Sequence, residues 1–334
     1  LLLGVVYEVC RAYPGIRFTL FTKKTVAPLF VYPPDNLTVF PVDTKGRYRG
    51  FAGLWRLYRD MKSQGIDAIA DLHNVLRTRV VGFFFAISGV KRVILDKGRA
   101  AKRRLVARKK PLPIQPLPTS FDRYRQVFAR LGFETPKTFR SVFDDRHLPL
   151  PLPEGIESRR EGEFWIGVAP FAKHEGKIYP LDRSESLVAR LSQREDCRVF
   201  LMGGGGEEAD LLGGWAEKYP RVVSLAGKRL GFAVELSMMS RMTLVVSMDS
   251  ANMHLASMAG TPVVSVWGQT HPYAGFLGWR QSKENIIQLS DLSCRPCSIF
   301  GNKPCYRGDY ACMQELSVER IWNRVEEILR REKK

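Results

Sequence analysis

The sequence predicts an α/β protein built from two Rossmann-like halves, each with a parallel sheet. Strand-like and helical segments alternate along the 334-residue chain, a pattern typical of parallel sheets with helical crossovers. Segment 144–163 is charged and rich in proline, a composition typical of linkers. Single hydrophobic cores stop growing at roughly 250–300 residues, so the length predicts two domains, which we place at 1–150 and 151–334.

The first half is expected to hold four strands and two helices. Its strands are short runs rich in β-branched and aromatic residues, bounded by turn residues. They lie at 16–22, 37–42, 66–72 and 91–96. A helical pattern at 51–65 separates two of these strands. The helix at 120–132 has a serine N-cap, apolar residues at helical spacing and a glycine stop, and it closes this half.

The second half repeats the alternation after the linker, with strands expected at 164–170, 197–202, 221–227, 242–248 and 262–268. The helix between the last two begins at Asp249 or Ser250 and stops at Gly260. A strand-helix-strand unit implies a parallel pair, whose ligands bind beyond the carboxyl ends of the strands. Asp249 and loop 268–272 emerge at that edge. A final helix at 317–334 has one apolar face, which must pack on the protein.

Hydropathy argues against a membrane-spanning or secreted chain. Hydrophobic residues make up 45% of the sequence, enough for sizeable cores. The longest apolar run, 80–90, is about half of the roughly 20 residues that span a bilayer. Segment 1–15 has neither a basic leader nor a clear cleavage site. We expect a soluble protein that begins at Leu1 because an upstream strand-loop-helix start of roughly 15–25 residues has been lost.

The excess of basic residues calls for an explanation in terms of partners. The chain has 52 basic and 34 acidic residues, a net charge of +18, and segment 97–110 has many basic residues and no acid. A solvated loop and a contact with anionic lipid or a phosphorylated acceptor explain this segment equally well. Nucleic acid is a weaker alternative, because no nucleic-acid-binding motif accompanies the run. The candidate contact residues are Arg99, Lys102, Arg103 and Arg104.

A glycine-rich loop in the second half is suited to a nucleotide. In segment 200–212 a strand runs through four glycines into a helix with an acidic first turn. Glycine backbone lets a ligand approach closely, and a carboxylate there could hold ribose hydroxyls. Acidic residues also stabilise the helix dipole, so a structural role has equal weight. The run fits neither G-x-G-x-x-G nor the P-loop pattern, which disfavours dehydrogenases and P-loop enzymes. The candidate residues are Gly204, Gly205 and Glu207.

A second polar loop, in segment 166–180, follows a strand and carries Lys177. A lysine at the end of a strand can neutralise a diphosphate and stabilise it as a leaving group. A solvated loop without function is the alternative, and this segment alone does not decide between the two.

Segment 249–272 resembles the signature of the bacterial lipopolysaccharide heptosyltransferases, glycosyltransferase family 9. That pattern is approximately D-[ST]-G-x-x-H-L-A, then G-x-P, then G-x-T-x-P. The matching residues are Asp249, Ser250, His254, Leu255, Ala256, Gly260, Pro262, Gly268, Thr270 and Pro272. Segment 169–180 is similar to the family's donor-phosphate loop, with Lys177 in the lysine position. The resemblance is strong over 166–330 and loose before it.

The resemblance implies a GT-B fold, in which two Rossmann-like domains face each other across a cleft. The second half would bind ADP-heptose and the first a lipid-linked core acceptor, in an inverting reaction that needs no metal cofactor. Asp249 would hydrogen-bond the sugar hydroxyls and Lys177 would compensate phosphate charge. The helix that opens at Ser250 and Ala251 would present amide donors to the diphosphate. The remaining donor-site candidates in this segment are His254 and Thr270.

The sequence departs from the family pattern at several positions. The family's catalytic base is an aspartate after the first strand; no residue here matches it, so we expect it upstream of Leu1. Ala251 and Phe171 replace glycines and Tyr179 replaces a tryptophan, which leaves the donor identity open. His254 lies about one turn into its helix, where packing explains it better than proton transfer, although its ordinary pKa permits both.

The six cysteines fall into two groups. Cys10 and Cys197 lie in apolar surroundings and are expected to be buried thiols. The other four have C-x2-C-x7-C-x6-C spacing, which could hold a structural zinc ion, although only one pair has the usual zinc-hairpin spacing. Reduced thiols are an equal alternative, and disulfides are disfavoured in a cytoplasmic protein. These four are Cys294, Cys297, Cys305 and Cys312.

These observations together predict a heptosyltransferase of lipopolysaccharide core synthesis, working as a peripheral protein at the cytoplasmic face of the inner membrane. Its expected partners are ADP-heptose, the lipopolysaccharide core acceptor and the anionic membrane surface. Two alternatives remain: a GT-B transferase that uses another nucleotide-sugar donor, and a basic nucleic-acid-binding protein.

Overall fold

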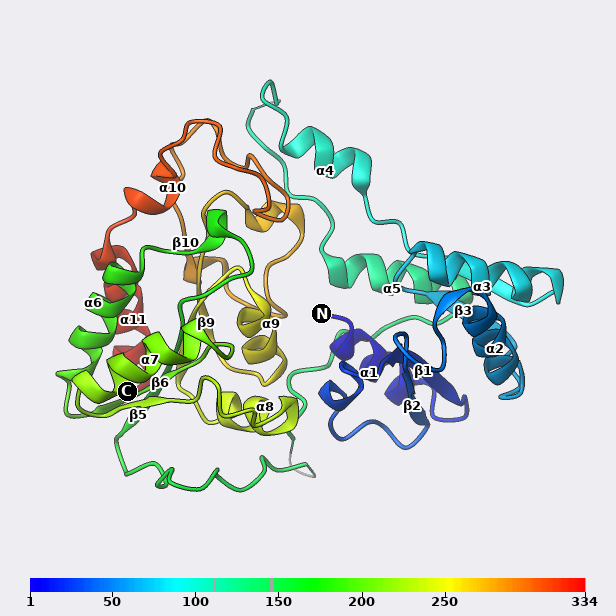
Figure 1. Ribbon diagram of the computed structural model, residues 1–334, viewed down its shortest axis with the longest axis horizontal. Coiled ribbons are helices and arrows are strands. Elements are labelled where there is room, and N and C mark those ends of the chain that lie inside the picture. The colour runs from blue at the N-terminus through cyan, green and yellow to red at the C-terminus, as the bar shows by residue number, and fades with distance from the viewer. Residues whose placement is uncertain (111, 145–146, 334) are drawn as a thin grey trace. The chain divides into compact units, whose positions relative to one another are not determined.

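Figure 1 shows the protein as a computed structural model, which describes residues 1–110, 112–144 and 147–333. The chain forms two compact units. Unit 1 comprises Leu1–Arg99 and Pro118–Phe139, and unit 2 comprises Ala100–Leu117 and Arg140–Lys334. This division differs from the predicted limits at 150 and 151, mainly because the basic segment that follows Arg99 is grouped with unit 2.

A six-stranded parallel sheet forms the centre of unit 2. Its strands are β5 (Phe164–Ala169), β6 (Cys197–Leu201), β7 (Val222–Ser224), β8 (Leu244–Met248), β9 (Val263–Val266) and β10 (Ile286–Ile287). The order across the sheet is β10-β9-β8-β5-β6-β7. The chain therefore starts in the middle at β5, runs to one edge, and returns to β8 on the other side of β5. This doubly wound order reverses direction between β5 and β8.

The strands of this sheet are apolar along their whole length because both faces are covered. Every residue of β5, β8 and β9 is buried, as expected for a parallel sheet with helices on both sides. The helices of unit 2 are α4 (Arg99–Leu105), which begins at the last residue of unit 1, α6 (Leu181–Ser192), α7 (Glu207–Lys218), α8 (Phe232–Ser240), α9 (Ala251–Met258), α10 (Ala311–Gln314) and α11 (Val318–Glu332). Short 3₁₀ helices η2 (Glu175–Lys177), η3 (Pro272–Ala274) and η4 (Lys283–Asn285) lie in the loops.

The last helix, α11, docks on unit 2 as its amphipathic pattern predicts. It contacts α6 and β9, and its apolar face joins the main core of the unit through Ile321, Val325, Ile328 and Leu329. The helix between β8 and β9 has the predicted Ser250 as its N-cap and ends at Met258, just before the predicted stop residue Gly260, which lies in the left-handed region at φ +85°.

Unit 1 contains two separate pairs of parallel strands. β1 (Phe18–Lys23) pairs with β2 (Leu37–Val42), and β3 (Ala68–Asp71) pairs with β4 (Lys91–Ile94). Its helices are α1 (Leu3–Ala12), α2 (Gly50–Lys62), α3 (Leu76–Ile87) and α5 (Ser120–Leu131), with the 3₁₀ helix η1 (Ala27–Leu29). All four predicted strands form. α5 is capped by Thr119 rather than by the predicted serine, because the Asp122 N–H donates to the Thr119 hydroxyl at 3.1 Å.

Two helices of unit 1, α1 and α3, have no counterpart in the sequence prediction. Their apolar residues form nearly continuous runs, and such runs do not distinguish a helix from a buried strand. α3 spans most of the apolar segment 80–90 and is exposed along one side. Among the described residues, none of the helices is both long and apolar enough to cross a membrane.

Candidate functional site

The reversal point between β5 and β8 defines the candidate site. In doubly wound sheets, neighbouring loops diverge at this point and leave a crevice at the carboxyl ends of the strands. The loop after β5 carries Lys177, at the end of η2, and β8 leads directly into Asp249. The strand register Ala169↔Ser247 places the two strand ends side by side.

Lys177 and Asp249 form an ion pair at this point. Lys177 Nζ lies 3.0 Å from Asp249 Oδ2 and donates a hydrogen bond to the Asp249 backbone carbonyl at 2.7 Å. Both side chains are largely buried, with 15% of Lys177 and 6% of Asp249 exposed. Two residues that are 72 positions apart in the sequence therefore form one charged centre at the edge of the sheet.

Ser250 is the N-cap of α9, but its side chain makes no capping hydrogen bond. Its hydroxyl lies 3.2 Å from the Ser247 hydroxyl instead. Ala251, the first residue of the helix, is exposed. Without a side-chain cap, the first N–H groups of α9 remain available as donors at the positive end of the helix.

The loop after β9 completes the site from the other side. The Gln269 N–H donates to the Gly176 carbonyl at 2.9 Å, which joins this loop to the Lys177 loop. Arg295, buried in the protein, donates to the carbonyl oxygens of Trp267 and Thr270 at 3.0 and 3.1 Å. Arg295 therefore fixes the backbone that presents Gln269 and Thr270.

Several buried polar atoms at this edge have no hydrogen-bond partner. Within the described residues they are Asp249 Oδ2, whose contact with Lys177 is an ion pair only, His254 Nδ1, Thr270 Oγ1, and both side-chain polar atoms of Gln269. Buried polar groups are nearly always satisfied in native proteins, so such a cluster needs an explanation. A polar ligand rich in hydroxyl and phosphate oxygens would supply the missing partners.

Glycines make room for the Lys177 side chain and its loop. A Cβ atom on Gly301, whose φ is +71°, would lie 2.5 Å from Lys177 Cγ. A Cβ atom on Gly176 would lie 2.1 Å from Gln269 Oε1. The loop that contains Gly301 thus leaves the space through which the lysine side chain reaches Asp249.

Comparison with known proteins identifies the family. The sequence profile of glycosyltransferase family 9 (heptosyltransferase) matches residues 54–303. The chain belongs to glycosyltransferase family 9. Lipopolysaccharide heptosyltransferase 1 of Pseudomonas aeruginosa is 25% identical over 306 residues, which cover 87% of this chain and 80% of the relative. The family assignment makes this protein a glycosyltransferase and removes the support for a nucleic-acid-binding protein.

Solved structures of family 9 proteins share the fold. A family 9 glycosyltransferase from Veillonella parvula superimposes with a TM-score of 0.71 at 18% identity, covering 98% of this chain and 92% of that one. The E. coli heptosyltransferase WaaC with ADP gives 0.67 at 17% identity, covering 98% and 94%. These matches confirm the predicted GT-B-type α/β class.

In the glycine-rich loop of this family 9 protein, one carboxylate has a structural role. Gly204 and Gly205 are exposed between β6 and α7, and Glu207 is exposed in the first turn of α7. The neighbouring Glu208 accepts a hydrogen bond from the Gly204 N–H at 2.6 Å, so this carboxylate holds the loop. Glu207 has no such bond among the described contacts and remains the candidate for a ribose contact.

Both histidines of the signature segment are held in their neutral form. Burial, together with the Arg295 guanidinium, lowers the pKa of His271 to about 4. Its Nδ1 accepts a hydrogen bond from the Tyr273 N–H at 3.1 Å. Burial also lowers the pKa of His254 well below its ordinary value. A neutral imidazole suits packing and hydrogen bonding to a ligand better than it suits charge compensation.

The basic segment forms helix α4 (Arg99–Leu105) followed by turns up to Lys110. Arg99, Arg103 and Arg104 are exposed, whereas Lys102 is half-buried with its ammonium 4.3 Å from the centre of the Phe276 ring. Lys110 donates to the Cys294 carbonyl at 3.2 Å. The segment is therefore an ordered, basic edge of unit 2 rather than a free loop.

The four clustered cysteines are free thiols. Burial raises the pKa of Cys312 to about 12, and it also raises the pKa of Cys297. Over residues 1–110, 112–144 and 147–333, no group of three or more His, Cys, Asp or Glu side chains is placed to hold a metal ion. The zinc prediction for Cys294, Cys297, Cys305 and Cys312 therefore gains no support. Cys10 and Cys197 are buried thiols, as predicted.

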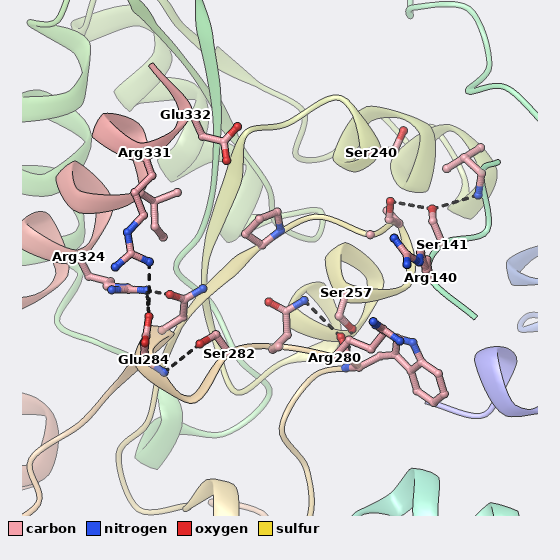
Figure 2. Close-up of a pocket in the computed structure, with 18 of the residues that line it drawn as sticks. Arg140, Ser141, Ser240, Ser257, Arg280, Ser282, Glu284, Arg324, Arg331 and Glu332 are labelled. Atoms are coloured by element: carbon pink, nitrogen blue, oxygen red, sulfur yellow. Dashed lines mark hydrogen bonds and ion pairs between the residues drawn. The ribbon is translucent and has the colours of Figure 1, made fainter. Parts of the chain in front are cut away.

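Figure 2 draws a second cavity, which has a volume of about 700 Å³. Ser240, Gly260 and Pro262 line it, so it is near the amino ends of β8 and β9, whereas Asp249 follows the carboxyl end of β8. Arg324 lines it as well, but pairs with Glu284 at 3.0 Å. None of the residues predicted for donor or acceptor binding lines this cavity.

Two residues of the site were missed by the sequence analysis. Gln269 stands inside the matched signature, at a position that the pattern leaves variable. Arg295 stands between two cysteines, where the cysteine spacing dominated the interpretation. The family pattern could have suggested Gln269, whereas nothing in the sequence indicates that Arg295 reaches the loop after β9.

Proposed function

We propose that this chain transfers a heptose from ADP-heptose to the inner core of lipopolysaccharide, with inversion and without a metal ion. The Lys177–Asp249 pair at the reversal point of the sheet, among buried polar atoms without partners, carries the proposal. The ligands of a protein that shares the fold support the same proposal, because E. coli heptosyltransferase WaaC has been solved with ADP and with ADP-2-deoxy-2-fluoro heptose.

The charges of the site suit a nucleotide diphosphate sugar. The ammonium of Lys177 would compensate the negative charge that develops on the departing ADP, and the uncapped N–H groups of α9 would add donors. Asp249 would accept hydrogen bonds from sugar hydroxyls. Gln269 and Thr270 would satisfy their buried polar atoms on the same ligand.

The proposed reaction is a single displacement. The oxygen of an acceptor hydroxyl forms a bond to the anomeric carbon while the bond from that carbon to the diphosphate oxygen breaks, which inverts the configuration. The hydroxyl proton passes to a general base and ADP leaves with the electron pair. None of the residues that the structure describes is assigned as this base.

We propose a cytoplasmic, peripheral location at the inner membrane for the enzyme. Its acceptor would be lipid-linked, and Arg99, Lys102, Arg103 and Arg104 would meet acceptor phosphates or anionic lipid. The support is the ordered basic edge formed by α4 and the stretch after it.

Calorimetric titration with ADP, UDP, GDP and ADP-heptose tests the donor site. Selective binding of ADP is expected, and Lys177→Ala should weaken it by about tenfold or more because a charge-assisted contact is lost. Asp249→Ala should remove the additional affinity of ADP-heptose over ADP while ADP binding persists. Lys173→Ala, an exposed lysine of the same loop, is the matched control and should bind like the unsubstituted chain.

The outcomes separate the donor alternatives. A folded sample that binds UDP or GDP in preference to ADP would assign the site to another nucleotide sugar. A folded sample that binds none of the three would overturn the donor-site proposal altogether. Equal losses in Lys177→Ala and Lys173→Ala would show that the ion pair at the sheet edge is not the binding centre.

A further inference from the structure

Helices α2 and α3 of unit 1 expose an unusual amount of apolar surface. Twelve large apolar side chains of the described residues are exposed, and five of these belong to the two helices. Their exposed fractions are 70% for Phe51, 46% for Trp55, 79% for Leu76, 61% for Phe83 and 72% for Ile87. Scattered apolar side chains are normal on a surface, whereas such a concentration marks a contact surface.

The exposed face of α2 combines aromatic and basic residues. Phe51, Trp55, Arg59 and Lys62 recur at intervals of four, four and three residues, so they share one side of the helix. All four are exposed. The opposite side holds the buried residues of the helix, which pack in the core of unit 1.

The exposed face of α3 is more apolar. Leu76, Phe83 and Ile87 are spaced by seven and four residues and lie on one side, with the exposed Arg79 between them. The buried residues of α3, including Phe85, lie on the other side in the same core as those of α2. Within the described residues, the outer face of α3 is exposed to solvent.

The half-buried Phe84 joins the two exposed faces. Its ring centre lies 4.9 Å from that of Trp55 and 6.1 Å from that of Phe51. Phe83, the next residue to it, has its ring centre 6.2 Å away. α2 and α3 also contact each other directly (Figure 1). The two helices therefore present one continuous aromatic surface, which we call the α2–α3 surface.

Positive charge surrounds the α2–α3 surface. The two helices contain five basic residues, Arg56, Arg59, Lys62, Arg77 and Arg79, but only one acidic residue. That acid, Asp60, is half-buried and pairs with Arg47 at 2.8 Å. An apolar centre with a basic margin is complementary to a bilayer whose headgroups are anionic and whose interior is apolar.

We infer that the α2–α3 surface docks on an anionic lipid bilayer, with Phe51, Trp55 and Phe83 entering the interface. The inference rests on the proposed membrane location and assigns a surface to it. Trp and Phe favour the interface between headgroups and acyl chains, and Lys and Arg stems extend to the headgroups. Exposed aromatic side chains beside exposed basic ones suit a membrane interface better than they suit a peptide or a helix.

Vesicle sedimentation tests this surface directly. The chain is expected to bind vesicles of phosphatidylcholine mixed with phosphatidylglycerol more strongly than vesicles of phosphatidylcholine alone. The double variant Phe51→Ser/Phe83→Ser should lower the partition coefficient by about tenfold or more, because two buried aromatic side chains are lost. Phe300→Ser, at a phenylalanine of unit 2 that is 54% exposed, is the matched control and should partition normally.

Tryptophan fluorescence supplies a second readout, which can be measured on the unsubstituted chain. Trp55 is exposed, whereas the five other tryptophans are buried or half-buried. Lipids brominated on their acyl chains should quench the emission of the bound chain. Trp55→Phe should remove the quenched component while leaving vesicle binding largely intact.

The outcomes distinguish this inference from the proposals it extends. Vesicle binding that is equal in Phe51→Ser/Phe83→Ser and Phe300→Ser overturns the α2–α3 surface but leaves the membrane location standing. No binding to either vesicle type overturns both. A dimer that the double variant dissociates, without vesicle binding, would show that a second copy of the chain covers the surface. ADP titration of the same variants reports on the donor site separately and should be unchanged.

Discussion

At the scale of single residues, the site depends on the ion pair between one lysine and one aspartate. Lys177 Nζ contacts both the carboxylate and the backbone carbonyl of Asp249. A buried lysine needs such partners because an isolated charge is costly to remove from water. A diphosphate would compete for the same ammonium group, so donor binding and the ion pair are linked.

Gly301→Ala tests whether the position of the Lys177 side chain matters. The new Cβ would lie 2.5 Å from Lys177 Cγ, so the lysine must move, and ADP binding is expected to weaken by roughly tenfold. Gly308→Ala is the matched control, since its φ of +82° imposes similar backbone strain but its Cβ would meet open space. Calorimetric titration of both variants checks the prediction, and equal affinities would contradict it.

His271 predicts a defined pH dependence of stability. Burial and Arg295 lower its pKa in the folded state to about 4, below the value of about 6.5 in an unfolded chain. Between these values the unfolded state binds the proton and the folded state does not. The stability contributed by neutral His271 is therefore complete above pH 6.5 and is lost as the pH falls toward 4. The loss should reach about 2–3 kcal/mol.

Urea titrations across that pH range measure the effect. His271→Gln removes the titrating group, so its free energy of unfolding should fall less between pH 6.5 and 4 than that of the unsubstituted chain. Parallel curves for the two proteins would show that another group causes the acid dependence.

At the scale of elements, buried ion pairs join helices that the sequence cannot pair. Glu8 of α1 is 1% exposed, and its carboxylate accepts from Arg125 of α5 at 2.9 Å and from the Phe139 N–H at 3.0 Å. The sequence alone gives no reason for a glutamate inside an apolar helix, because its partner Arg125 lies 117 positions away. Removing one partner of such a pair leaves the other charge buried.

Glu8→Ala is expected to destabilise unit 1 by about 3 kcal/mol, because Arg125, only 14% exposed, loses a buried partner. Lys218→Ala breaks an exposed ion pair with Glu185 and should leave the free energy of unfolding nearly unchanged. Denaturant unfolding of both variants decides the matter. Similar values for the two would mean that the α1–α5 contact depends on apolar packing alone.

At the scale of the whole molecule, each unit has a hydrophobic core of its own. The core of unit 2 surrounds its six-stranded sheet and includes α11, and unit 1 holds separate clusters beneath α2, α3 and α5. Domains with separate cores can unfold separately. The donor site of unit 2 and the α2–α3 surface of unit 1 can therefore be tested independently of each other.

Scanning calorimetry should resolve two unfolding transitions. ADP at a concentration of about 100 times its Kd should stabilise one of them by about 2.7 kcal/mol, because a ligand that binds only the folded state stabilises it. Glu8→Ala should lower the other transition. A single transition that responds to both changes would show that the two units unfold together.

The sequence by itself determined the class of protein. Strand and helix periodicity, caps and glycine stops act over a few residues, and these local patterns predicted the alternation of elements in both halves. The family signature was also readable, because Asp249, Ser250, His254 and Thr270 stand in one contiguous segment. α1 and α3 escaped prediction, since their continuous apolar runs carry no clear period.

Only the tertiary structure decided how distant residues meet. The order of strands places β8 beside β5, and that neighbourhood brings Lys177 to Asp249. The tertiary structure also reveals that Arg295 donates to the loop that contains Thr270, and that α3 exposes an apolar face. Contacts between residues far apart in sequence depend on how whole elements pack, and packing energy is shared among many side chains. No local pattern encodes that arrangement.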